Sequence, residues 1–198
     1  FGLYLRHASR TVLMNIINAI KTGDVKRAPR LEAMLSKAIE TNKQRELSYV
    51  RQATIDALTG CKNRRAFDSD IAALMNDHQP FALALVDIDN FKSINDTWGH
   101  LNGDIVLRNV AREGLQVLQP LEISLYRYGG EEFVVVLPGV SLAHATAIAE
   151  RIQQKIREAG LPHAASAVAS EVTVSIGIVA SDGTVPIETL IARADSAL

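Results

Sequence analysis

The segment LYRYGGEEFVVVLPG, residues 125–139, constrains the fold of this chain more than any other stretch. Gly129 and Gly130 separate two apolar stretches, which is the pattern of an antiparallel hairpin with a tight glycine turn. The adjacent Glu131 and Glu132 are unusual at the root of an apolar strand, because two like charges repel each other. The segment is therefore either an ordinary turn or a turn that also holds a cation.

A second strand is predicted at 81–89, FALALVDID, a short and largely apolar run of the kind that lies buried in a sheet. Asp87 and Asp89 are two positions apart, so their side chains point the same way if the strand continues to residue 89. The pair also has an ordinary explanation, because Asp often ends strands and begins turns.

Helices and strands alternate along the rest of the chain. The sequence predicts helices at about 64–76, 91–96, 105–118 and 141–159, a strand at 171–180, and a final helix opened by Pro186. Gly99 and Gly103 are expected to bracket a loop. The order β-α-α-β-β-α-β-α predicts an α+β fold of ferredoxin-like or polymerase-palm type, with helices over one face of the sheet.

A helical segment at 1–55 precedes this domain, which we place at 56–198. Apolar residues at helical spacing define two stretches joined by KTGD at 21–24: Val12, Leu13, Ile16, Ile17 and Ile20, then Leu31, Met34, Leu35, Ala38 and Ile39. The second helix buries little surface by itself, so we expect it to pair with another copy, or else to fold back on its own domain. The pattern resembles a HAMP-type signalling module.

Composition limits the partners of the chain. A formal net charge of -1 creates no overall field toward nucleic acid, and the single Cys61 rules out an intramolecular disulfide. The apolar runs fall far short of the roughly 18 residues that span a bilayer. We expect a cytoplasmic domain that does not bind nucleic acid. Because the chain opens with Phe1, we interpret it as a fragment; segments outside it would provide any anchor in the inner membrane.

The two acidic segments are expected to meet. In a palm-like sheet, the strand that ends at Asp87 lies beside the strands that flank the glycine turn, so Asp87 approaches Glu131 and Glu132. Clustered carboxylates raise each other's pKa unless a cation neutralises them. Oxygen ligands without a His or Cys cluster favour Mg²⁺, which usually shares the phosphates of a substrate. The pairing therefore implies a nucleotide.

The stretch NFKSIND, residues 90–96, suits the phosphates of such a nucleotide. A helix start there would present backbone N–H groups and the positive end of the helix dipole to an anion. Lys92 would add a mobile positive charge. The alternative for Lys92 is a solvated surface lysine.

These residues together resemble the GGDEF family of diguanylate cyclases, in its GGEEF variant. The matching motifs are DALTG at 56–60, NRRAF at 63–67, VDIDNFKSINDTWGHLNGD at 86–104, YRYGGEEF at 126–133 and VTVSIGIV at 172–179. The resemblance implies that two GTP molecules condense to cyclic di-GMP with release of two pyrophosphates. It also implies a homodimer, in which each domain holds one GTP and the two domains face each other.

The resemblance further implies roles for individual residues at the phosphate end. Asp87, the carbonyl group of Ile88 and Glu131 would bind Mg²⁺, with Mn²⁺ as an alternative. Glu131 or Glu132 would help to deprotonate the attacking 3′-hydroxyl group. The remaining residues would position the substrate: the Asn90 and Phe91 amides and Lys92 would hold phosphates, Gly129 and Gly130 would leave room for it, and Arg127 would support the turn.

The guanine end has its own set of implied residues. Guanine presents N1–H and N2–H₂ as neighbouring donors, and the resemblance assigns Asp104 to accept both, with Asn95 beside it and His100 lining the pocket. Adenine would leave Asp104 facing a lone pair, at a cost of roughly 1–3 kcal/mol. Without the resemblance, Asp104 is equally well explained as a helix N-cap after Gly103.

Two features depart from the family pattern. The product-inhibition motif R-x-x-D is replaced by PLEI at 120–123, which predicts no feedback inhibition through that site. The basic tail expected after ADSAL is not in this chain, so we expect a catalytic domain truncated at its C-terminus. We favour an active cyclase controlled by dimeric alignment. The alternatives are a catalytically silent module that binds GTP or cyclic di-GMP, and another palm-type nucleotidyl cyclase.

Overall fold

The computed structural model describes residue 14 and residues 28–162 and 171–198. The chain divides into two compact units, Phe1–Arg51 and Gln52–Leu198. The first predicted helical stretch, apart from Met14, and the KTGD connector lie outside the described residues. In the part of the chain that is described, no helix combines the length and the apolar content that crossing a bilayer requires.

Helix α2 (Ala28–Thr54) accounts for the second predicted helical stretch. Its side chains Met34, Ile39, Leu47 and Tyr49 have exposed fractions of 50, 59, 52 and 61%. A helix with this many exposed apolar side chains gains little stability from its own chain, because helical stability in proteins comes mainly from packing of an apolar face.

The second unit is built on a five-stranded sheet with the order β1-β3-β4-β2-β5. The strands are β1 (Lys62–Asn63), β2 (Phe81–Ile88), β3 (Leu125–Gly129), β4 (Glu132–Pro138) and β5 (Val174–Ser181). Only the β1–β3 pair is parallel; the other three pairs are antiparallel. The predicted hairpin is confirmed as β3–β4, and β2 lies between β4 and β5, away from the edges of the sheet.

The helices of this unit are α3 (Arg64–Asn76), α4 (Phe91–Trp98), α5 (His100–Leu118), α6 (Leu142–Glu158) and α7 (Ile187–Asp195), with the 3₁₀ helix η1 (Gln119–Leu121) after α5. The predicted α3 and α6 are confirmed, and each begins with a side-chain cap. Asn63 accepts a hydrogen bond from the Ala66 N–H, and Ser141 accepts one from the His144 N–H. The α+β fold class is confirmed.

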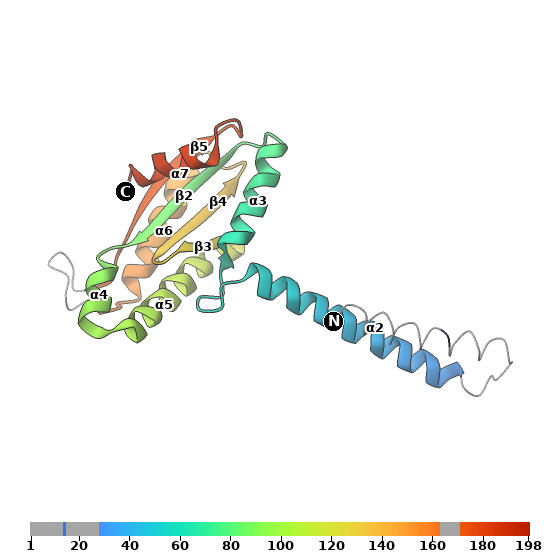
Figure 1. Cartoon of the computed structure of the whole chain (residues 1–198). Helices are drawn as coiled ribbons and strands as arrows, with labels where there is room; N and C mark the ends of the chain where they lie inside the picture. The colour runs from blue at the N-terminus through green and yellow to red at the C-terminus, as the bar shows by residue number, and fades with distance from the viewer. Residues whose placement is uncertain (1–13, 15–27, 163–170) are drawn as a thin grey trace. The chain divides into compact units, whose positions relative to one another are not determined.

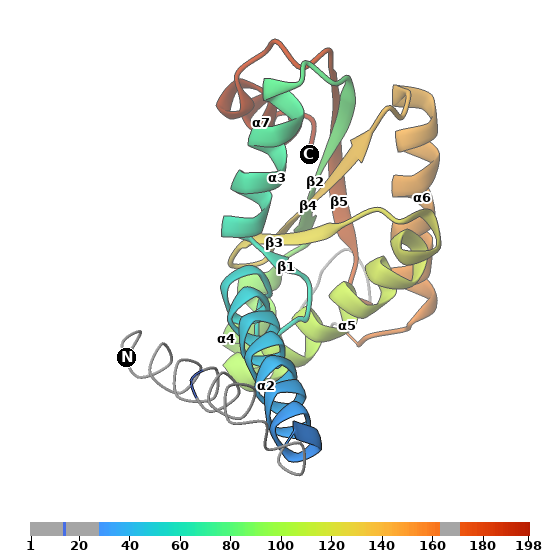
Figure 2. The ribbon, with the colours of Figure 1, turned by 90° about the vertical axis from the view of Figure 1, so that its right-hand side faces the viewer.

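The prediction that helices cover one face of the sheet is wrong. Helices α3 and α7 lie on one face, and α4, α5 and α6 lie on the other (Figures 1 and 2). Alternate residues of β2 serve the two cores: Leu83 and Leu85 belong to the cluster with Phe67 and Leu190, whereas Ala84 packs in the other cluster with α5 and α6. The reason is in the sequence, because an unbroken apolar strand has to be buried on both sides.

Two predicted boundaries also need correction. Gly99 lies between α4 and α5 with φ of 81°, but Gly103 is a buried residue inside α5 and does not bracket a loop. Strand β5 begins at Val174, later than predicted, and Glu171 pairs only with Pro162 in an isolated bridge. Cys61 is buried in the core of the second unit, with 1% of its surface exposed.

Candidate active site

Strand pairing brings the two predicted acidic segments together. Asp87, the penultimate residue of β2, lies directly opposite Glu132, the first residue of β4. Glu131 precedes Glu132 in the turn, and all three side chains are half-buried. The predicted meeting of the acidic strand end with the glycine turn is confirmed.

The electrostatics of Asp87 reflect this crowding. Burial, together with the negative charges of Glu131, Glu132, Asp89 and Asp195, raises the pKa of Asp87 to about 6. An opposite charge at this position would reverse part of that effect, because it favours the ionised carboxylate. The site therefore favours a cation beside Asp87.

Asp195 also contributes negative charge beside Asp87, and it was not among the predicted site residues. It is the last residue of α7, and α7 lies very close to β5 at Gly177: a Cβ there would overlap the carbonyl oxygen of Ala194. The available signal was Gly177 in SIGIV, since glycine inside a strand often marks the close approach of another backbone.

Arg127 supports the glycine turn, as expected. Its Nε and Nη2 atoms donate to the carbonyl oxygen of Gly130 at 3.2 and 2.9 Å, and its Nη1 atom pairs with Oδ1 of Asp56 at 3.2 Å. Gly130 has φ of 49°, a left-handed conformation that glycine adopts without strain. The registers of β3 and β4 shift between Arg127 and Gly129, so the turn carries an irregularity that re-aims the residues after it.

Asp56 ties the DALTG motif to this turn. Its Oδ1 atom accepts hydrogen bonds from the backbone N–H and the hydroxyl group of Thr59 at 2.9 and 2.6 Å. Burial alone would raise the pKa of Asp56, but these bonds and the charge of Arg127 lower it overall. The Asp56–Arg127 pair could not be predicted from the sequence, because the two residues lie in distant segments.

Asp89 lies just beyond β2, which ends at Ile88. Its two carboxylate oxygens accept hydrogen bonds from the hydroxyl groups of Thr173 and Ser175. The expectation of parallel side chains required a strand that continues to residue 89, and the strand stops one residue short of it. The negative charge of Asp89 still contributes to the raised pKa of Asp87.

The start of α4 has the features predicted for an anion. Asn90 is its N-cap residue, has φ of 55° and makes no side-chain capping bond. In the described part of the chain, no hydrogen bond satisfies the backbone N–H groups of Phe91 and Lys92. The Phe91 side chain is buried, whereas Lys92 is exposed and forms no ion pair with any described residue.

The predicted guanine residues gather where α4 meets α5. A Cβ on Gly103 would overlap Oδ1 of Asn95 and lie 3.2 Å from Cζ of Phe91, so the missing side chain leaves the space that the Asn95 amide occupies. Asp104 follows Gly103 and is half-buried, and His100 is exposed at the first position of α5. The N-cap explanation for Asp104 is wrong, because Gly99 is the N-cap and Asp104 lies inside the helix.

Around Asp87 the available donors are carboxylate and carbonyl oxygens. Among the described residues, no three His, Cys, Asp or Glu side chains are close enough to hold a metal ion by themselves. A cation held by only one or two carboxylates, with substrate phosphates and water as its other ligands, is the usual arrangement for Mg²⁺. The residues present fit that arrangement.

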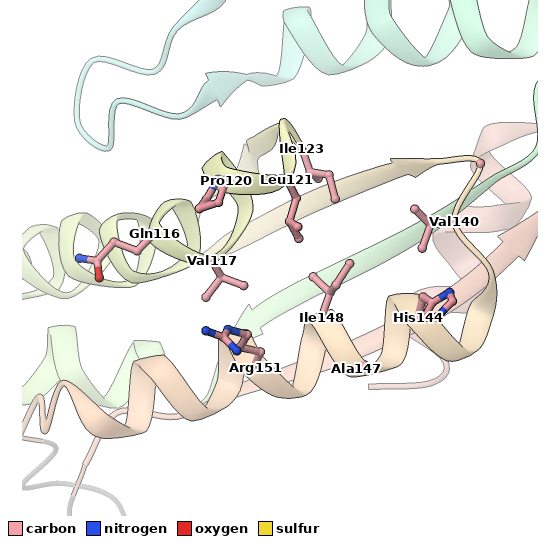
Figure 3. Close-up of a pocket in the computed structure, with 11 residues that line it drawn as sticks. Gln116, Val117, Pro120, Leu121, Ile123, Val140, His144, Ala147, Ile148 and Arg151 are labelled. Atoms are coloured by element: carbon pink, nitrogen blue, oxygen red, sulfur yellow. The ribbon is translucent and has the colours of Figure 1, made fainter.

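A cavity of about 730 Å³ lies apart from these carboxylates, between the end of α5, η1 and α6 (Figure 3). Pro120, Leu121 and Ile123 of the PLEI stretch line it, and Leu121 and Ile123 face Ile148 across it. Its lining contains no acidic side chain. The cavity is thus chemically unlike the site around Asp87.

A match to a known protein family agrees with this geometry. Residues 53–198 match the family described as diguanylate cyclase, GGDEF domain. The chain belongs to the GGDEF family.

Curated relatives of this GGDEF domain include diguanylate cyclase VdcA of Vibrio cholerae, 39% identical over 149 residues, and response regulator PleD of Caulobacter vibrioides, 36% identical over 198 residues. These alignments cover 75 and 91% of this chain and 44 and 43% of the relatives. The chain therefore spans less than half the length of either relative.

Solved structures show the same GGDEF fold. The coiled coil and GGDEF domain of DgcB from Caulobacter crescentus, in complex with c-di-GMP, is 29% identical with a TM-score of 0.71, covering 86% of this chain and 92% of that chain. Diguanylate cyclase SiaD from Pseudomonas aeruginosa, in complex with its activator SiaC, is 27% identical with a TM-score of 0.67, covering 99 and 83%.

Proposed function

We propose that this GGDEF domain is a diguanylate cyclase that condenses two GTP molecules into cyclic di-GMP and two pyrophosphates. The observation that carries the proposal is the position of Asp87 opposite Glu132, beside an intact GGEEF turn. The name of the curated relative VdcA, a diguanylate cyclase, supports the same reaction.

At the phosphate end, Asp87, the carbonyl group of Ile88 and Glu131 would hold Mg²⁺ or Mn²⁺. The bound cation would offset the crowded negative charge and polarise the phosphate groups of GTP. The unsatisfied amide of Phe91, the neighbouring Asn90 amide and the Lys92 ammonium group would bind the β- and γ-phosphates.

At the base end, Asp104 would accept hydrogen bonds from N1–H and N2–H₂ of guanine. Asn95 lies beside it, in the space left by Gly103, and His100 would line the open side. This assignment predicts selectivity for GTP over ATP, because adenine offers an acceptor where guanine offers a donor.

The chemistry needs two domains. The 3′-oxygen of one GTP would form a bond to the α-phosphorus of the other, the bond to pyrophosphate would break, and Glu131 or Glu132 would take the proton from the 3′-hydroxyl group. Since each domain holds one GTP, alignment of a homodimer would control the rate. The exposed apolar side chains of α2 are the surface that would pair.

GTP is the substrate that this proposal requires, and no nucleic acid takes part. A cytoplasmic location follows for the domain, since GTP is supplied there. Any anchorage in the inner membrane would come from segments outside this chain.

The deciding experiment incubates purified protein with GTP and Mg²⁺ and resolves the products by chromatography and mass spectrometry. We expect cyclic di-GMP and pyrophosphate, lost on chelation of the metal and restored by its return. Asp87→Asn and Glu131→Gln should abolish the product, whereas Asp68→Asn, on the exposed surface of α3, should not. The absence of cyclic dinucleotide from a demonstrably dimeric sample of the intact protein would contradict the proposal.

A further inference from the structure

We propose that Asp89 is a positioning residue for the phosphate-binding loop, held by the hydroxyl groups of Thr173, just before β5, and of Ser175 on β5. This inference rests on the proposed binding of GTP at the start of α4, and it assigns a role to a carboxylate that the proposed reaction does not itself use. The supporting observations are the hydrogen bonds of Asp89, the conformation of Asn90 and the unsatisfied amides that follow.

Three hydrogen bonds join residue 89 to Thr173 and Ser175, at the start of β5. The Thr173 hydroxyl group donates to Oδ2 of Asp89, and the Ser175 hydroxyl group donates to Oδ1 at 2.7 Å. The backbone N–H of Asp89 donates to the carbonyl oxygen of Thr173 at 3.0 Å. Both side-chain oxygens and the backbone of Asp89 are therefore held by one short stretch, residues 173–175, where β5 begins.

The next residue shows why this anchoring matters. Asn90 has φ of 55° and ψ of 30°, a left-handed conformation that a residue other than glycine adopts at an energetic cost. Such a conformation persists only where its surroundings hold it. Asn90 makes no side-chain capping bond, so its conformation is held by the anchored Asp89 on one side and by the bonds of its own carbonyl oxygen to α4 on the other.

The left-handed residue sets the direction of the first turn of α4. The Asn90 carbonyl oxygen accepts from the N–H groups of Ser93 and Ile94 at 2.9 and 3.3 Å, which leaves the N–H groups of Phe91 and Lys92 without a partner in the described part of the chain. These are the donors that would meet a phosphate. A change at Asn90 would turn them away from it.

Asp89 acts here through hydrogen bonds and not through an ion pair. Among the described residues, no Lys, Arg or His side chain pairs with its carboxylate. An Asn at this position has the same size, but its amide nitrogen cannot accept a hydrogen bond from a hydroxyl group. The hydroxyl group that faces this nitrogen would have to turn and accept, so Asp89→Asn exchanges a charge-assisted hydrogen bond for a weaker neutral one with little change in volume.

The first test compares binding of GTP with binding of guanosine, which lacks phosphates, to the intact protein by calorimetry. For Asp89→Asn we expect the dissociation constant for GTP to rise at least tenfold, about the value of one hydrogen bond to a charged group. The affinity for guanosine should stay within about twofold, because the predicted base pocket is not touched. Equal weakening of both ligands, or of neither, would overturn the proposal.

The second test needs no ligand. Amide hydrogen exchange followed by NMR should show faster exchange at Ser93 and Ile94 in Asp89→Asn than in the parent protein, with the centre of β2 unchanged. Unchanged exchange at these two amides would show that Asp89 does not hold the loop. If the parent protein failed to bind GTP, the proposed function would fail, while this measurement would still decide the role of Asp89.

Matched variants separate positioning from general stability. Thr173→Val should weaken GTP binding as Asp89→Asn does. Thr173→Ser should keep the GTP affinity of the parent protein, because serine retains the hydroxyl group. Thr146→Val is the control, since Thr146 lies at an exposed position of α6 and its hydroxyl group donates to the Leu142 carbonyl oxygen of the same helix. A Thr173→Val protein with normal GTP affinity would contradict the proposal.

Discussion

The guanidinium group of Arg127 donates two hydrogen bonds to the carbonyl oxygen of Gly130, at 3.2 and 2.9 Å. The same group pairs with Asp56, which lies 71 positions earlier in the chain. The glycine turn is thus held from both its own strand and a distant segment. This arrangement gives the glutamates after Gly130 a fixed direction.

Arg127→Lys should loosen this turn. A lysine carries the charge but cannot donate from a planar fork to Gly130 and Asp56 at once. We expect a loss of roughly 1–3 kcal/mol in unfolding free energy, measured by denaturant titration, and a larger loss of cyclase activity than of stability. Arg108→Lys, at an exposed position on α5, is the control. A variant with full activity and full stability would show that the contacts are incidental.

Asp87 should make the metal-free protein less stable as the pH rises. Because burial and the neighbouring carboxylates raise its pKa from 3.8 to about 6, the folded state holds this proton more tightly than the unfolded state does. Its contribution to stability is present at low pH and is lost as the pH rises from about 4 to about 6.

Thermal unfolding in a chelating buffer across this pH range measures the effect. Asp87→Asn should remove this part of the pH dependence and should melt higher than the parent protein at neutral pH. Asp68→Asn supplies the matched exposed control. Identical pH profiles for the parent protein and Asp87→Asn would contradict the expected effect of charge crowding.

Gly103→Ala should impair recognition of the base. The added methyl group would overlap Oδ1 of Asn95, so this amide or the whole of α4 has to move. We expect selectivity for GTP over ATP to fall by about tenfold, the value of one misplaced hydrogen bond, in competition binding. Gly114→Ala is the control in the same helix, since its methyl group would meet only the flexible end of Leu125 at 3.1 Å.

The product should not inhibit the enzyme through the PLEI stretch. Pro120, Leu121 and Ile123 line an apolar cavity without an acidic side chain, which offers no carboxylate to the base of a guanine nucleotide (Figure 3). At saturating GTP, added cyclic di-GMP should leave the initial rate unchanged. Inhibition that survives saturating GTP and disappears in Leu121→Ala would refute this expectation.

A charge on the exposed apolar side of α2 should separate two copies of the chain. Ile39 is 59% exposed, and Ile39→Lys would place like charges together in a paired helix. We expect a monomer in analytical ultracentrifugation and a specific activity that falls steeply on dilution. Lys43→Gln, at another exposed position, should leave assembly intact. A dimeric and fully active Ile39→Lys protein would show that α2 does not mediate pairing.

The elements that bear the site could be predicted because their signals are local. Continuous apolar runs and a glycine pair predicted β2, β3 and β4, and antiparallel pairing of these strands is enough to bring Asp87 to Glu132. The start of α5 differs from the prediction. Gly103, expected in a loop, lies inside the helix, and its missing side chain lets α4 pack closely on α5.

The supporting contacts could not be predicted, because they join segments far apart in the sequence and depend on side-chain reach. Thr173 and Asp89, whose side chains share a hydrogen bond, are 84 positions apart. Nothing in either segment indicates the other as its partner. The two-residue strand β1 is too short for any periodic pattern. Asp195 enters the site only through the close packing of α7 on β5.

The central place of β2 in the sheet also has a consequence for how the site comes into being. Asp87 needs β4 on one side, and the loop after it needs β5 on the other, which the chain supplies only 86 positions beyond Asp89. Contacts of such long sequence separation form slowly, since a large loop must close first. A nascent chain that has not yet delivered β5 therefore carries the GGEEF turn without the Ser175 hydroxyl group that holds Asp89.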